Sequence, residues 1–431
     1  MKVNLTTTDV GGFNFEFLRI VSCQSVGAAE IGECLYTIGR IEDGSFDSWI
    51  TEWNRTAGRV AAEARRLLTA GQPLAARDAF LRAANYFRAA EFYATHDDPR
   101  QVAVWQASRD CFAQAVPLLR FPAEPIEVAF DGARLPGYFV RGGSRRAPTL
   151  IAMSGFDGSA EEVYYWIGPA AAERGWNCLI FEGPGQRGAL HLNPGLVLRP
   201  DYEAPVGAVV DYALSRPEVD PARLALLGYS LGGFLAVRAA AFETRLRAVI
   251  ANSLVVDVGA AFAAVWPKIL RGSFPSAVDT AFTLLARLRP DTRWGINHAR
   301  WALGVNHPHE FFAAWKPFTL WGTEDRLTTP LLCVVGEDEI AQTSADMITQ
   351  TIRYLRAVRG PTELAYLPKE TGASSHCQMG GLAYAHAAIF EWLTRTVTSE
   401  PPAHPPPHTL VFPNGAIAAV RRYHPRVAVE E

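Results

Sequence analysis

The chain has 431 residues, of which 49% are hydrophobic and 20% are charged. Its 41 basic and 44 acidic residues leave a net charge of −3, so the composition indicates neither a nucleic-acid-binding nor a membrane-binding surface. Since this length exceeds what one small hydrophobic core needs, we expect two parts or one heavily decorated domain.

The six cysteines are scattered without the spacing of metal ligands, and they favour a reducing compartment. The N-terminus lacks a basic segment followed by an apolar one, and the longest apolar run, 258–266, is too short to cross a bilayer. We therefore expect a soluble, cytoplasmic protein without a metal or a cofactor.

The first 45 residues carry a mixed signal, in which 13–17 alternates apolar and polar residues like a strand after the turn-forming Gly11-Gly12. Three segments then repeat their apolar residues at helical spacing: 48–70, 74–93 and 99–116. No strand pattern interrupts them. We interpret residues 1–121 as an N-terminal segment and a helical cap, and we expect the cap to cover the active site.

Strand and helix patterns alternate from Pro122 onward. The expected strands are short and apolar: 126–130, 135–140, 149–153, 177–181, 224–229, 248–252, 331–335 and 363–367. The first two flank Asp131-Gly132 and predict a hairpin. The alternation predicts an α/β fold with a mostly parallel eight-stranded sheet that helices cover on both faces.

We therefore expect an α/β core over residues 122–398, with a helical lid insertion at about 255–327 that is rich in Trp and Phe. A Pro-rich tail follows at 399–431. Residues 410–420 around Pro413-Asn414-Gly415 fit either a hairpin or a disordered end.

The motif Gly228-Tyr229-Ser230-Leu231-Gly232 ends one of these strands and begins an Ala-rich helical run. Strand, motif and helix together are typical of the nucleophile elbow of α/β-hydrolases, although the motif alone also fits an ordinary turn. We expect Ser230 to be a catalytic nucleophile, and the backbone N–H of Leu231 to face the oxyanion.

The other catalytic residues should follow the serine in the order acid, then histidine. The loop after the last strand contains His376, which we expect to take the Ser230 proton. The loop after strand 331–335 offers the carboxylates of 337–339 as the acid. A second oxyanion donor should come from the loop after strand 149–153, and the backbone N–H of Phe156 is the candidate.

These motifs resemble a group of α/β-hydrolases with an N-terminal helical cap. The group includes dihydroxypseudooxynicotine hydrolase, fungal yellowish-green-type polyketide-shortening hydrolases and the fermentation–respiration switch protein family. The likeness spans about residues 48–396. The matching pieces are Ser154-Gly155-Phe156-Asp157-Gly158 with Glu161-Glu162, Glu182-Gly183-Pro184-Gly185-Gln186, Asp201-Tyr202-Glu203, Gly228–Gly233 and His376-Cys377-Gln378.

The resemblance implies an acid at the last position of Gly-x-x-Asp. This register selects Glu339 slightly, although a shifted loop would bring in Asp338, which is of the usual residue type. The family contains enzymes that cleave a C–C bond beside a ketone, as well as esterase-like and peptidase-like hydrolases. The turn Gly183-Pro184-Gly185-Gln186 is expected to shape the pocket floor.

We therefore expect a serine hydrolase for a medium-sized, mostly apolar small molecule with an activated carbonyl, either a β-dicarbonyl or polyketide-like compound or an ester or thioester. Its expected contacts are Asp157, Tyr229, Trp266 and Trp301. The alternatives are an acyltransferase or cyclase of natural-product biosynthesis and a non-catalytic regulator. We expect no nucleic-acid or membrane partner, and a homodimer is the candidate oligomeric state.

Overall fold

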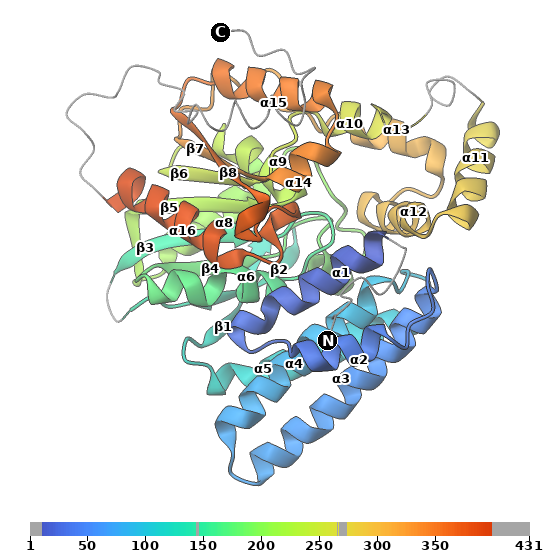
Figure 1. Cartoon of the computed structure of the whole chain (residues 1–431). Coiled ribbons are helices and arrows are strands. Elements are labelled where there is room, and N and C mark those ends of the chain that lie inside the picture. The colour runs from blue at the N-terminus through green and yellow to red at the C-terminus, as the bar shows by residue number, and fades with distance from the viewer. Residues whose placement is uncertain (1–10, 144–145, 265, 267–273, 399–431) are drawn as a thin grey trace. The chain divides into compact units, whose positions relative to one another are not determined.

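The structure is a computed structural model that describes residues 11–143, 146–264, 266 and 274–398 (Figure 1). It divides into two compact units. The helical unit comprises residues 1–124 and 273–309, and the sheet unit comprises residues 125–272 and 310–431. The Pro-rich tail and the hairpin considered at 410–420 lie outside the described residues.

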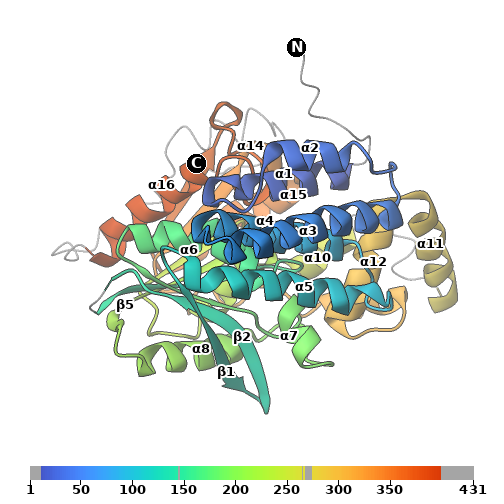
Figure 2. The same cartoon turned by 90° about the horizontal axis from the view of Figure 1, so that it is seen from below.

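The helical unit contains α1 (Gly11–Ser22), α2 (Ile31–Ile38), α3 (Phe46–Thr69), α4 (Pro73–Phe92), α5 (Arg100–Ala115), α11 (Pro275–Leu288) and α12 (Pro290–Leu303). Figure 2 shows α3, α4 and α5 side by side. Ser45 starts α3 by accepting a hydrogen bond from the Ser48 N–H at 3.2 Å, and Pro73 opens α4, where a missing N–H costs no helical bond. The three helices predicted between residues 48 and 116 are confirmed.

The strand-like alternation of residues 13–17 is a wrong prediction, because these residues form the middle of α1. Phe13, Phe17 and Ile20 are spaced four and three residues apart, so they share one helix face, and all three are buried. A spacing of four residues places two side chains on the same side in both a helix and a strand, so Phe13 and Phe17 fit both periods. Phe15 fits only the strand period, and in the helix it is half-buried.

Residues 273–309 belong to the helical unit, so the prediction that they form part of an insertion in the core is wrong. The ring of Trp294 on α12 stacks on Phe92 of α4 with centroids 4.8 Å apart, and its Nε1 donates to the Phe92 carbonyl at 3.0 Å. The neighbouring Arg293 lies over the Phe46 ring and donates to the Gly44 carbonyl. The helical unit is therefore built from two separate stretches of chain.

The sheet unit is built on eight strands in the order β1-β2-β4-β3-β5-β6-β7-β8. They are β1 (Ala123–Phe130), β2 (Ala133–Val140), β3 (Ala147–Met153), β4 (Asn177–Phe181), β5 (Val219–Tyr229), β6 (Ala248–Asn252), β7 (Leu331–Gly336) and β8 (Thr362–Leu367). Strand β2 pairs antiparallel with β4, and the strands from β4 to β8 in that order pair in parallel. The predicted fold class and its mostly parallel eight-stranded sheet are confirmed.

Two local features explain the agreement between the predicted and the observed strands. All residues of β4 and β6 are buried, as expected of parallel strands covered on both faces. The turn between β1 and β2 places Asp131 and Gly132 at φ 47° and 77°, which is the left-handed backbone of a tight hairpin turn that Asp-Gly favours.

The helices of the sheet unit are α6 (Ala160–Glu173), α7 (Arg187–Leu192), α8 (Glu203–Ser215), α9 (Leu231–Ala240), α10 (Val258–Ala264), α13 (Phe311–Trp315), α14 (Glu337–Gln342), α15 (Ala345–Ala357) and α16 (Leu382–Leu393). Figure 2 shows α6 and α16 on one face of the sheet and α8 on the other. The loops after β3, β5, β7 and β8 leave the same edge of the sheet, because parallel strands end there together.

Residues 337–342, which we expected to form a loop after β7, form helix α14. An antiparallel bridge between Asp257 and Thr319 joins the first and last parts of the insertion. None of the helices in the described residues combines the length and the apolar character needed to cross a lipid bilayer.

Candidate active site

Ser230 lies at the sharp turn between β5 and α9. Its backbone has φ 58° and ψ −126°, a conformation that costs a non-glycine residue about 1–3 kcal/mol. Small neighbours permit the turn, since a Cβ on Gly228 would overlap the Gly232 carbonyl oxygen, and one on Gly233 would overlap that of Ser253. The Ser230 N–H donates to the Asn252 carbonyl at 2.5 Å and ties the turn to the end of β6.

His376 lies beside this serine. Its Nε2 is 2.8 Å from Ser230 Oγ, and its Nδ1 is 2.5 Å from Glu339 Oε1. The side chain of His376 is 38% exposed whereas that of Glu339 is 11% exposed, so the ring can meet a substrate while the acid stays shielded. The structure thus joins Ser230, His376 and Glu339 by two consecutive hydrogen bonds.

The three adjacent carboxylates after β7 point to different partners. Glu339 uses its second oxygen, Oε2, to accept the Gly336 N–H at 3.2 Å. Asp338 accepts the Ser374 hydroxyl at 2.5 Å and pairs with Lys369 at 2.9 Å. Glu337 accepts the Lys369 N–H. Because α14 rotates successive side chains by about 100°, Glu339 and not Asp338 contacts the His376 ring.

The electrostatics of these groups follow from their neighbours. Burial lowers the pKa of His376, but Cys377 and the Glu339 carboxylate outweigh it and hold that pKa well above its ordinary value. Burial raises the pKa of Asp338, yet Lys369 and Ser374 hold it below its usual range. Asp338 is therefore an ionised partner of Lys369.

The loop after β3 packs directly against the Ser230 turn. A Cβ on Gly155 would lie 2.6 Å from the Tyr229 carbonyl oxygen, 2.7 Å from the Leu231 nitrogen and 2.8 Å from Ser230 Cβ. Residue 155 must be glycine for the loop to approach so closely. The close approach brings the backbone of Phe156, the next residue, near the N–H of Leu231, the first residue of α9.

The residues predicted to contact a substrate lie in different surroundings. Asp157 is half-buried next to Phe156, and its carbonyl accepts Arg187 Nε at 3.1 Å. Tyr229 is 2% exposed, and its ring packs edge-on against Trp166 in the core, which leaves no open face for a substrate. Trp301 belongs to the helical unit, where its ring contacts His298.

Trp266 is part of an aromatic cluster in the sheet unit. Phe262 of α10 contacts Trp266, Phe311, Phe312 and Trp315, with ring centroids 5.4–6.5 Å apart. Trp315 in turn lies 5.5 Å from the Phe156 ring. The cluster therefore extends from the insertion to the loop after β3.

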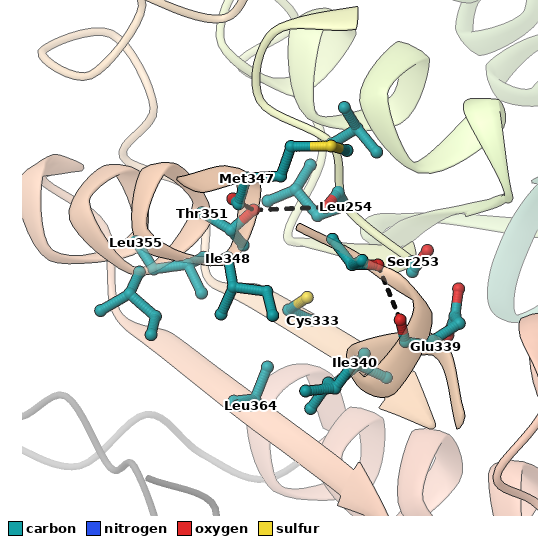
Figure 3. Close-up of a pocket in the computed structure, with 14 residues that line it drawn as sticks. Ser253, Leu254, Cys333, Glu339, Ile340, Met347, Ile348, Thr351, Leu355 and Leu364 are labelled. Carbon is teal, nitrogen blue, oxygen red and sulfur yellow. Dashed lines mark hydrogen bonds between the residues drawn. The ribbon is translucent and has the colours of Figure 1, made fainter. Parts of the chain in front are cut away.

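A cavity of about 80 Å³ lies behind Glu339 (Figure 3). Figure 3 shows Glu339 at one side of the cavity and Ile348 and Leu355 of α15 at the other. Most of its walls are aliphatic, and the Thr351 hydroxyl bonds to the Leu254 carbonyl within them. Sequence reasoning missed this cavity because its walls come from β7, β8, two helices and the loop after β6, which share no motif. Within the described residues, no group of three His, Cys, Asp or Glu side chains could hold a metal ion.

A family model described as "Esterase FrsA-like" matches residues 32–263 of this chain. Hydrolase LUC6 from a Fusarium species is 31% identical over 405 residues, which cover 89% of this chain and 96% of the relative. The 20-hydroxy-prefusarin hydrolase FUS2 from Gibberella moniliformis is 32% identical over 409 residues, with the same two coverages.

Among solved structures, that of 2,6-dihydroxy-pseudo-oxynicotine hydrolase is similar, with a TM-score of 0.68 and 19% sequence identity. The match covers 88% of this chain and 95% of that one. At such a low identity the likeness concerns the fold.

Proposed function

Because the chain belongs to the FrsA-like esterase family of α/β-hydrolases, we propose that it cleaves an activated carbonyl compound through an acyl-enzyme on Ser230. That the chain is a hydrolase follows from the family; the nucleophile, the mechanism and the substrate class are the proposal. The observation that carries it is the pair of hydrogen bonds from Ser230 to His376 and from His376 to Glu339.

In the first step, His376 Nε2 takes the Ser230 proton while Oγ forms a bond to the substrate carbonyl carbon. The carbonyl electrons move to its oxygen, and the N–H groups of Leu231 and Phe156 stabilise the resulting oxyanion. Glu339 holds the protonated imidazole through Nδ1–H. Its second oxygen is fixed by the Gly336 N–H, so the carboxylate does not rotate away.

In the second step, the oxyanion collapses and the bond to the leaving group breaks. His376 gives its proton to that group, which is an enolate carbon in a β-dicarbonyl substrate or an alkoxide in an ester. Water then attacks the acyl-enzyme by the same proton route, which releases the acid and restores the Ser230 hydroxyl.

The aromatic cluster around Phe262 supports a mostly apolar substrate, because it reaches the Phe156 loop. The relative FUS2 is named for 20-hydroxy-prefusarin, and the structural neighbour for 2,6-dihydroxy-pseudo-oxynicotine. Both names describe hydroxylated small molecules. We propose a hydroxylated, polyketide-like ketone as the first substrate class to try and an activated ester as the second.

The test uses a fluorophosphonate probe, which reacts with an activated serine. We expect the wild-type chain to be labelled at Ser230, as located by peptide mass spectrometry, and Ser230→Ala to remain unlabelled. We expect His376→Ala to slow labelling by at least ~10⁴-fold, because no group then takes the serine proton. Labelling at another residue, or undiminished turnover by Ser230→Ala, would refute the nucleophile.

A further inference from the structure

The turn Gly183-Pro184-Gly185-Gln186 after β4 lies directly under the loop after β3. Gln186 is 0% exposed, and its Nε2 donates to the carbonyl of Ser154 at 2.7 Å and to that of Gly155 at 3.2 Å. Its Oε1 accepts the Gly183 N–H at 2.7 Å. Two of these hydrogen bonds join the two loops, and the third fixes the Gln186 side chain within its own turn.

These bonds fix the direction of a peptide unit in the candidate oxyanion hole. The bond between Gly155 and Phe156 is trans, so its N–H points opposite to its carbonyl. Because the Gly155 carbonyl faces Gln186, the Phe156 N–H must face away from Gln186. Arg187 is 1% exposed, and its Nε donates a hydrogen bond to the Asp157 carbonyl. This bond restrains the other end of the same loop.

The turn that contains Gln186 is itself stabilised by contacts with Tyr202 and Leu198. Tyr202 is 0% exposed and donates its hydroxyl to the Pro184 carbonyl at 3.2 Å. A side chain on Gly183 would overlap this hydroxyl, and one on Gly185 would overlap Leu198. Tyr202 belongs to the Asp201-Tyr202-Glu203 motif. The hydrogen bonds therefore connect three sequence motifs, which are 154–158, 182–186 and 201–203.

We propose that Gln186 is the positioning residue that aims the Phe156 N–H at the developing oxyanion, with Tyr202 supporting it through the turn at Pro184. The inference rests on the proposed function of Ser230. Gln186 touches no reacting atom, and it acts by holding the Ser154 and Gly155 carbonyls on the side opposite to the substrate.

The test compares Gln186→Met with a matched control, Asn177→Leu. Asn177 is also 0% exposed, donates to Thr149 Oγ1 and the Glu218 carbonyl, and accepts the Gly142 N–H. It starts β4, so it lies at the opposite end of the strands from Ser230. Each variant removes three buried hydrogen bonds, but only Gln186 lies under the proposed oxyanion hole.

The readout is the rate constant for fluorophosphonate labelling of Ser230, measured beside Tm and, on a p-nitrophenyl ester, kcat and KM. We expect Gln186→Met to slow labelling and lower kcat by about 10²-fold with KM within about threefold, as for the loss of one oxyanion donor. Asn177→Leu should lower Tm comparably, yet label within about threefold of wild type. If Gln186→Met does not fold, Gln186→Glu keeps the acceptor for Gly183, and Asn177→Asp becomes its control.

Equal labelling rates for wild type and the folded Gln186 variant would overturn the positioning role and leave the proposed function standing. Equal slowing of both matched variants would overturn it as well, because loss of stability would then explain the effect. A wild-type chain that does not label at Ser230 would overturn the proposed function and the positioning role together.

Discussion

The hydrogen bond between His376 Nδ1 and Glu339 Oε1 sets the behaviour of the imidazole. A carboxylate at this position fixes the tautomer that leaves Nε2 free to take the serine proton, and it stabilises the charged ring that results. Asp338, one residue earlier, is occupied by Ser374 and Lys369 instead. The two acids therefore have separable roles, of which only one concerns the ring.

We predict that Glu339→Gln lowers kcat by about 10⁴-fold, because an amide favours the wrong imidazole tautomer. Asp338→Asn should lower kcat by less than about tenfold, since its loss affects the Lys369 pair and not the ring. Both values come from steady-state kinetics on one activated ester. A large loss of kcat in Asp338→Asn, together with a nearly normal kcat in Glu339→Gln, would show that Asp338 and not Glu339 is the acid.

The raised pKa of His376 predicts the pH dependence. The ring must be neutral to accept a proton, so kcat/KM should rise as the pH increases through that pKa and level off above it. Removing the negative charge of Glu339 lowers the pKa of the ring, so in Glu339→Gln this rise should move to lower pH. Profiles of kcat/KM against pH for both proteins test the sign, which a shift to higher pH would contradict.

At the scale of elements, the site depends on how closely the loop after β3 approaches the turn after β5. Gly155 makes this approach possible because it has no Cβ to meet the Tyr229 carbonyl, the Leu231 nitrogen and Ser230. The loop is closed on itself by Ser154 Oγ, which donates to the Gly158 carbonyl at 2.9 Å. A displacement of this loop therefore moves Phe156 as well.

We predict that Gly155→Ala lowers kcat by at least ~10²-fold, because its methyl group would push the loop away from Leu231 and misplace the Phe156 N–H. Gly143→Ala is the matched control, since nothing lies within 4 Å of a Cβ at Gly143. It should leave kcat within about twofold of wild type. Steady-state kinetics on both variants, with circular dichroism to check folding, tests the contact; similar kcat values would disprove it.

Most strands and helices could be predicted from the sequence because each obeys a local rule. Apolar runs bounded by turns predicted β4 and β6 with their observed ends. The motif Gly-x-Ser-x-Gly between a strand and a helix predicted the turn at Ser230. The prediction for residues 13–17 was wrong because they alternate with the strand period, whereas the helical spacing of Phe13, Phe17 and Ile20 is visible only over a longer window. The Gln186 bonds were out of reach, since they link loops about 30 residues apart by side-chain geometry that no spacing encodes.

At the scale of the whole molecule, the helical unit needs both of its chain segments. Trp294 stacks on Phe92, and Arg293 contacts Phe46 and Gly44, so α12 is held by residues that precede the sheet in the sequence. Neither α11 nor α12 is long enough to be a stable helix alone in water.

We predict that deleting residues 1–121 unfolds α11 and α12 while the sheet persists. Amide hydrogen exchange in peptides from 275–303 should then be about 10³-fold faster than in the full chain, as the loss of local structure worth several kcal/mol implies. Peptides from β5 and β6 serve as the internal control and should stay protected. Unchanged exchange over 275–303 would show that these two helices do not depend on the N-terminal ones.

The division of the helical unit into residues 1–124 and 273–309 has a consequence for the order of assembly during synthesis. The first helices leave the ribosome early, but their remaining partners follow only after six strands of the sheet have been made. Glu339 and His376 come later still, on the segments after β7 and β8. Under the proposed mechanism, a nascent chain carries Ser230 long before it carries the Glu339 and His376 side chains that activate it. We therefore expect the serine to stay unreactive until the segment after β8 has been made.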